Sequence, residues 1–196
     1  MREDKDRSGK WLLEHHGDSV LRLAGVSGFA RWRPAAAEVV LPKLLADGLL
    51  EVFFPDRAEP DPFLVEIATY PERRANTQVL RDAVAVYLDR EVLPEVLTLV
   101  LRPKGNLRLT GGHEVESRHR WTRAAVAWRV VELWTVPAEP LLAAGDVGLV
   151  PWVPLAQYDG PPEALLQQCR ERIDRDAPAA ERPSLLAVSQ VMTRLR

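Results

Sequence analysis

The spacing of apolar positions along the chain predicts an ordered series of helices and strands. Runs that alternate between apolar and polar residues, separated by short turns, are typical of antiparallel strands. A later run that is apolar on both faces is typical of a strand covered on both sides. The elements predicted in this way are a helix over 9–24, strands around 36–42, 48–54 and 63–69, a helix ending near 90, and a strand over 96–101.

The start of the second predicted helix has the clearest local sequence signal for a helix N-terminus. Thr69 is followed three residues later by Glu72, which fits a capping box, and Pro71 would fall in the first helical turn, where its missing N–H costs little. The strand before this helix and the buried strand after it would then form a right-handed βαβ unit. We therefore expect the helix to be capped by Thr69.

The rest of the chain is less regular and carries more proline and glycine. The elements predicted there are a loop or irregular hairpin over 103–125, a long strand over 125–136, a short helix closed by Gly145, a packed loop over 149–155, and helices over 162–175 and 184–195. The last helix has an apolar stripe formed by Leu185, Val188, Met192 and Leu195. This stripe would dock onto the domain, or would form a homodimer if it is exposed.

These elements predict an α/β fold with three parts. Residues 1–8 are charged and would be loose, 9–136 would form the α/β core, and 137–196 would be a helical C-terminal extension packed on or beside that core. The 196 residues are 46% apolar, which is enough to fill a hydrophobic core.

Composition narrows the class of protein further. No apolar run approaches the ~18 residues that span a bilayer, and the N-terminal letters MREDKDRSGK lack the apolar stretch of a secretory signal. The single cysteine, Cys169, excludes an internal disulfide framework. We therefore expect a cytoplasmic protein without a membrane partner.

Charge gives two opposing indications about nucleic acid. The net charge of −2 counts against a protein that coats duplex DNA, because phosphate neutralisation dominates the affinity of such proteins. Residues 102–129, however, contain seven basic residues and two acidic ones. This local excess of positive charge leaves a phosphate-bearing partner open.

Acidic residues in the predicted strands suggest chemistry. Glu66 lies inside an otherwise apolar strand, where an ionised carboxylate is costly unless it pairs with an arginine or binds a cation. Two hairpin registers fit the sequence: one places Asp47 opposite Glu66, and the other places Glu51 there. In either register two carboxylates repel each other on one face of the sheet. A divalent cation with oxygen ligands, Mg²⁺ or Mn²⁺, would hold both.

Two sequence segments carry a family resemblance. With LADGLLEV at 45–52 and PFLVEIATYPERR at 62–74, residues 8–136 resemble the PD-(D/E)XK nuclease superfamily, and more closely its recombination-promoting nuclease (Rpn-type), transposase-like branch. The resemblance implies a restriction-endonuclease-like core, ordered as helix, three antiparallel strands, helix and parallel strand. It also implies Asp47, Glu66 and Glu14 as metal ligands, and magnesium-assisted hydrolysis of DNA.

The chain departs from the family pattern at one important position. The family's lysine belongs two residues after the third-strand acid, where this chain has Ala68. Such a lysine would orient water and offset transition-state charge, which alanine cannot do. We expect Arg73, Arg74 or Gln78, near the start of the following helix, to replace it, with Arg74 and Gln78 joining the two acids in catalysis.

These inferences lead to two hypotheses of different classes. The first is a Mg²⁺-dependent DNA endonuclease linked to DNA mobility or recombination. The second is a catalytically inactive nuclease-fold protein that serves as a binding or assembly module. The acid pair favours the enzyme, whereas Ala68 and the acidic isoelectric point, near 6.1, favour the inactive module.

Overall fold

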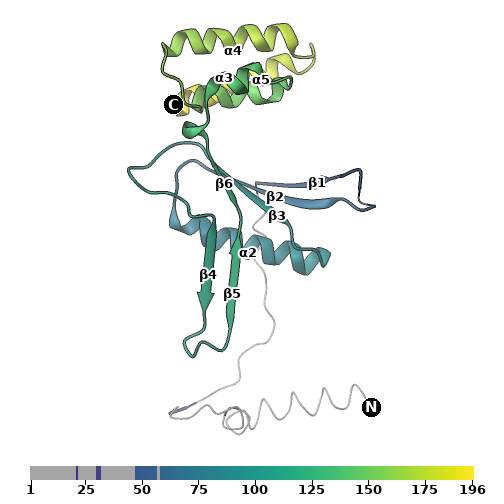
Figure 1. Ribbon diagram of the computed structural model, residues 1–196, viewed down its shortest axis with the longest axis vertical. Coiled ribbons are helices and arrows are strands. Elements are labelled where there is room, and N and C mark those ends of the chain that lie inside the picture. The colour runs from purple at the N-terminus through teal and green to yellow at the C-terminus, as the bar shows by residue number, and fades with distance from the viewer. Residues whose placement is uncertain (1–20, 22–29, 32–46, 57) are drawn as a thin grey trace. The chain divides into compact units, whose positions relative to one another are not determined.

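The computed structural model describes residues 47–196 apart from 57, together with residues 21, 30 and 31. The chain divides into two units, Met1–Pro42 and Lys43–Arg196. All of the helices and strands labelled in Figure 1 belong to the second unit. The predicted strand over 36–42, and the predicted helix over 9–24 except for Leu21, lie outside the described residues.

Within the described part of the chain, the main sheet has four strands in the order β1-β2-β3-β6. These are β1 (Gly48–Val52), β2 (Asp61–Ala68), β3 (Glu95–Val100) and β6 (Arg129–Glu132). β1 and β2 are antiparallel, whereas β2, β3 and β6 are parallel. Helix α2 (Arg73–Arg90) connects β2 to β3, so the predicted βαβ connection is confirmed. The protein therefore has a mixed α/β fold with a mixed sheet.

Helix α2 does not begin as the sequence predicts. Its N-cap is Glu72, in extended conformation and without a side-chain cap hydrogen bond, so the capping box with Thr69 is wrong. The Glu72 carboxylate instead contacts Arg74 Nε, at 2.5 Å, and Lys104 Nζ, at 3.4 Å. These cations compete for the carboxylate that the capping box would require.

The core beneath the main sheet explains why α2 packs where it does. Leu64 of β2 and Val96 of β3 are buried together with Val79 and Ala83 of α2. Val79 and Ala83 are four residues apart, so they lie on the same face of the helix. Alternation along β2 directs Leu64 and Glu66 to the face that this helix covers.

The predicted strand over 125–136 is interrupted at Trp128. Its first part is β5 (Arg123–Ala127), which pairs with β4 (Gly112–Glu116) in a separate hairpin, and its second part is β6. The Trp128 N–H donates to the Gly111 carbonyl at 2.8 Å, and the Trp128 side chain packs against the core around Leu64. Pairing with β4 before Trp128 and with β3 after it divides the segment. The predicted loop or irregular hairpin over 103–125 includes β4 and the start of β5, so the hairpin alternative is the one observed.

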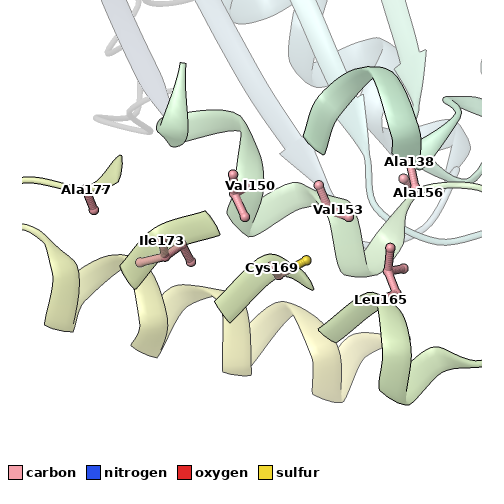
Figure 2. Close-up of a cluster of buried hydrophobic side chains, with 8 residues drawn as sticks. All are labelled: Ala138, Val150, Val153, Ala156, Leu165, Cys169, Ile173 and Ala177. Carbon is pink, nitrogen blue, oxygen red and sulfur yellow. The ribbon is translucent and has the colours of Figure 1, made fainter. Parts of the chain in front are cut away.

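The C-terminal segment forms its own hydrophobic cluster. It consists of α3 (Ala138–Ala143), the 3₁₀ segment η2 (Val147–Leu155), α4 (Pro162–Asp176) and α5 (Arg182–Leu195). Figure 2 shows the buried side chains of α4 facing those of η2. On α4 these are Leu165, Cys169 and Ile173, spaced four residues apart.

One detail of this segment differs from the prediction, because the predicted loop over 149–155 is a 3₁₀ helix that includes Pro151 and Pro154. The short helix α3 ends at Ala143 with Ala144 as its C-cap, so Gly145 directly follows the end of the helix, as predicted. In the same segment, burial raises the pKa of the Cys169 thiol to about 11, which leaves it protonated and unreactive near neutral pH.

The apolar stripe on α5 is mostly used inside the unit. Leu185 packs against the cluster of Figure 2. Met192 and Leu195 pack against a third cluster, which joins the C-terminal segment to the ends of the main strands through Leu101, Leu133 and Leu155. Val188 is exposed. The homodimer through this helix stays a prediction. No helix in the described part of the chain is both long enough and apolar enough to span a membrane.

Candidate functional site

The pairing register of β1 and β2 places two acids next to each other. Gly48 pairs with Val65, and continuing the ladder by one residue places Asp47 opposite Glu66. Of the two registers that the sequence allows, the structure has the one that places Asp47, and not Glu51, opposite Glu66. Glu51 lies opposite Pro62, and its Oε1 accepts a hydrogen bond from Arg90 Nη1 at 2.7 Å. Glu51 is therefore an ion-paired strand residue outside the site.

Asp47 is oriented by the neighbouring strand. It comes directly before β1, and its Oδ2 accepts a hydrogen bond from the backbone N–H of Ile67 at 2.7 Å. This contact holds the carboxylate beside β2, at a position open to solvent. Among the residues that the structure describes, the second oxygen of Asp47 makes no hydrogen bond, so it can accept a ligand.

Glu66 lies in a far less hydrated position. It is only 9% exposed, and its Oε1 has no hydrogen-bond partner within the described residues. The residue paired with it on β3 is Thr98, which is fully buried and whose Oγ1 also has no partner there. Buried polar oxygens are nearly always hydrogen-bonded or bound to a ligand, so two such atoms on adjacent strands mark this place as a candidate site.

A third acid comes from the covering helix and is absent from the sequence-based hypothesis. Asp82 of α2 is 4% exposed, and its Oδ2 is a further buried oxygen that has no partner among the described residues. The signal was present in the sequence, because Asp82 falls three residues after Val79, on the buried face of the helix.

These neighbours change the acidity of Glu66. Burial, first, and then the negative charges of Asp82 and Asp47 raise the pKa of Glu66 from 4.5 to about 7. A protonated Glu66 can also donate a hydrogen bond to the Asp82 side chain, which acts in the same direction, whereas with both carboxylates ionised Glu66 Oε1 and Asp82 Oδ2 have no donor among the described residues. The positive charge of Arg81 opposes the rise. The Arg81 Nε, however, lies 3.3 Å from Asp82 Oδ1. Arg81, on α2, therefore pairs with Asp82, and no arginine among the described residues forms an ion pair with Glu66.

Asp47 and Glu66 line a cleft of about 660 Å³, whereas Asp82 is not among its lining residues. Glu66 and Thr98 contribute from strands, Asp47 from the residue before β1, and the predicted residues Gln78 and Arg74 from the first turns of α2. The Arg74 side chain is 87% exposed and is held by Glu72, so it lies at the rim. Gln78 is four residues before Asp82, on the same side of the helix. The predicted catalytic residues are thus brought together, with Gln78 nearer to the acids along the helix.

A lysine at the rim was also missed by the sequence-based hypothesis. After β3 the chain continues beside the end of β2, because the Leu101 and Arg102 N–H groups donate to the Ala68 and Thr69 carbonyls at 2.9 Å. This path brings Lys104 to the cleft. Its Nζ lies 3.4 Å from Glu72 Oε1 and 5.7 Å from the centre of the Tyr70 ring, and both of these residues line the cleft.

The cleft offers oxygen donors of the type that hard divalent cations prefer, but not a complete set of ligands. Among the residues described by the structure, no group of three acidic, histidine or cysteine side chains is arranged to share one ion. Mg²⁺ is commonly held by one or two carboxylates together with several waters. Asp47 and Glu66, with their unpartnered oxygens in one cleft, meet that smaller requirement. Glu14, the third predicted ligand, lies outside the described residues.

Comparisons of the chain with models of known protein families, with curated proteins and with solved structures find no match. The geometry of the cleft and the resemblance carried by the sequence are therefore the grounds on which a function can be proposed.

The raised pKa of Glu66 predicts how stability depends on pH. Because the folded state binds this proton more tightly than the unfolded chain, Glu66 lowers the free energy of unfolding as pH rises from about 4.5 to about 7. The loss should total roughly 3 kcal/mol, at about 1.4 kcal/mol per pKa unit. Glu66→Gln should remove this decline, as measured by urea unfolding below and above that pH range in the absence of divalent cations.

The matched control is Glu95→Gln, which neutralises an exposed acid on the adjacent strand β3. It should keep the pH dependence of the wild type. Parallel stability curves for the wild type and Glu66→Gln would show that Glu66 titrates as an ordinary surface carboxylate.

Proposed function

We propose that this protein is a metal-dependent DNA endonuclease with a restriction-endonuclease-like core, in which Asp47 and Glu66 hold Mg²⁺ or Mn²⁺. The observation that carries the proposal is the crowding of Glu66. It is buried, next to Asp82 and near Asp47, with a carboxylate oxygen that has no partner among the described residues. The order of strands and helix from β1 to β3 is also the order expected for the second half of such a core. A link to DNA mobility or recombination rests on the sequence resemblance alone.

A cation explains the arrangement better than an ion-pair network does. Arg81 is paired with Asp82 and offsets only part of the effect on Glu66, and Arg90 is paired with Glu51. An unneutralised buried carboxylate destabilises a fold unless it binds a proton or a cation. When bound, a divalent cation in such a site lowers the pKa of water and stabilises charge on the departing oxygen.

The chain's own residues supply the other requirements of phosphodiester hydrolysis. Asp47, fixed by the Ile67 N–H, and Glu66, fixed by the sheet, provide ligand oxygens on adjacent strands. The Gln78 amide can donate to a water or to a phosphate oxygen from the wall of the cleft. Lys104 brings positive charge to the rim, in the role that the family gives to the lysine that Ala68 replaces.

The second candidate function is a nuclease-like domain that binds or assembles without catalysis. One specific observation favours it: Ala68 lines the cleft at the position of the family's lysine. Lys104 and Arg74 at the rim both contact Glu72, which reduces the positive charge that they offer to a phosphate. The two candidates differ in whether the cleft cleaves DNA, so cleavage itself separates them.

Conversion of supercoiled plasmid to nicked circles, with Mg²⁺ or Mn²⁺, tests the proposal. The wild type should nick the plasmid, and Asp47→Asn and Glu66→Gln should each lower the rate by at least about 100-fold, because each removes a ligand charge. Glu51→Gln, on the same strand as Asp47 but paired with Arg90, should retain activity within a few-fold. Equal rates for all four proteins, or no cleavage by the wild type, would favour the second candidate, a nuclease-like domain without catalysis.

The part played by Lys104 can be tested with a complementary pair of changes. Lys104→Ala should slow nicking by roughly 10- to 100-fold, the range expected when one stabilising charge is lost near a reacting phosphate. Adding Ala68→Lys to that variant places an ammonium where the family has one and should restore much of the rate. If Lys104→Ala cleaves at the wild-type rate, the positive charge comes from another residue, and Arg74→Ala is then the variant to compare.

A further inference from the structure

A hairpin outside the main sheet extends from the helix that covers the cleft. Strands β4 and β5 form a separate antiparallel ribbon. At its base, His113 Nε2 lies 3.5 Å from Thr77 Oγ1 of α2, and Val126 and Trp128 pack against the core around Leu64. From there the two strands project past α2 to a free tip (Figure 1). The base of the hairpin is therefore fixed and its tip is exposed.

The tip has a defined conformation and an unusual composition. Its four residues are Arg118, His119, Arg120 and Trp121. The flanking residues close the loop, because the Ser117 N–H donates to the Thr122 carbonyl at 2.9 Å and the Thr122 N–H donates to Ser117 Oγ at 3.1 Å. These bonds close the loop, which presents two guanidiniums, an imidazole and an indole to solvent.

Packing within the described part of the chain does not explain the position of Trp121. It is 64% exposed, and its ring contact is with the His119 ring, whose centroid is 6.2 Å away. Arg120 adopts a left-handed backbone conformation, with φ of 60°, which is uncommon for a residue other than glycine. A large exposed indole on a conformationally restricted turn is typical of a recognition surface, since it adds nothing to the core.

Charge on the hairpin is distributed so that the tip is basic. The two acids of β4 are already paired, Glu114 with Arg123 at 2.6 Å and Glu116 with Arg120 at 3.7 Å. Arg118 has no ion-pair partner among the described residues. The acids of the strand are therefore neutralised by ion pairs, whereas at the tip Arg118 is unpaired among the described residues and Trp121 is exposed.

We propose that the β4–β5 hairpin is a DNA-binding arm that inserts its tip into a groove of duplex DNA. A two-stranded ribbon fits the major groove of B-form DNA, and arginines bind phosphates or base edges there. Trp121 would make apolar contacts with sugars and base edges exposed in that groove. This inference rests on the proposed function only for the identity of the substrate, because the binding itself needs no catalysis.

The base of the arm adjoins the proposed active site. Thr77, which contacts His113, directly precedes Gln78, which lines the acidic cleft. A duplex bound at the tip would therefore lie on one side of the cleft. The length of the hairpin would set the distance between the bound duplex and the cleft. The arm would fix the position of the scissile phosphate by binding the duplex beside it, so its residues are positioning residues and not catalytic ones.

Binding can be measured separately from cleavage. The test uses the full chain carrying Glu66→Gln, in EDTA, with a fluorescently labelled duplex of about 20 base pairs and salt varied between about 50 and 200 mM. Added to this background, Trp121→Ala should weaken binding at least about ten-fold, and Trp121→Phe should retain most of the affinity. Arg118→Ala should weaken binding several-fold and reduce the slope of affinity against salt by about one charge.

Two matched controls remove similar groups elsewhere. Arg170→Ala removes an exposed guanidinium from α4, and Phe53→Ala removes an exposed aromatic ring from the end of β1. Both should bind within about two-fold of the background protein. Unchanged affinity for Trp121→Ala and Arg118→Ala would overturn the proposal, as would losses seen with single-stranded DNA but not with the duplex. Failure of cleavage in the plasmid assay, with hairpin-dependent binding intact, would contradict the endonuclease alone.

Discussion

The candidate site depends on one electrostatic constraint: Glu66 is buried close to two other carboxylates, the buried Asp82 and the solvent-exposed Asp47, whose negative charges disfavour its ionisation. Glu66 lies at the centre of this constraint, because the sheet buries it and Asp82 and Asp47 repel its charge, which raises its pKa to about 7. At neutral pH the site must therefore hold a proton or gain a cation. A structural ion pair would have relieved the same repulsion, but Arg81, whose charge opposes it in part, pairs with Asp82.

The strand register and the packing of α2 hold Asp47 and Asp82 close to Glu66. The register of β1 against β2 brings Asp47 to Glu66, and a shift of one residue would turn one of them to the opposite face of the sheet. Packing of Val79 against Leu64 fixes the rotation of α2 and so directs Asp82 toward the strands. The same helix anchors the β4–β5 hairpin. One helix thus links the acidic cleft to the arm that we propose for DNA binding.

Much of the fold follows from the sequence, but the composition of the site follows only in part. Alternation along 63–69 puts Glu66 on the same face as Leu64, and the structure shows that helix α2 covers that face. The two carboxylates were predicted with two registers open, because the sequence does not show which residues form the turn. Asp82 was missed because an acid within a helix is more often a solvated residue than a buried one. Lys104 was missed because its approach depends on how the chain leaves β3, which no local pattern encodes. The break at Trp128 similarly reflects competition between two pairing partners.

The most direct test of the central claim is calorimetry of Mg²⁺ binding near pH 6.5, repeated in buffers with different ionisation enthalpies. If the cation takes the place of the proton on Glu66, binding should release a substantial fraction of one proton from the wild type near that pH, and much less near pH 8.5. Glu66→Gln should release none. Binding of Mg²⁺ without proton release, or no binding at millimolar concentrations, would contradict the account.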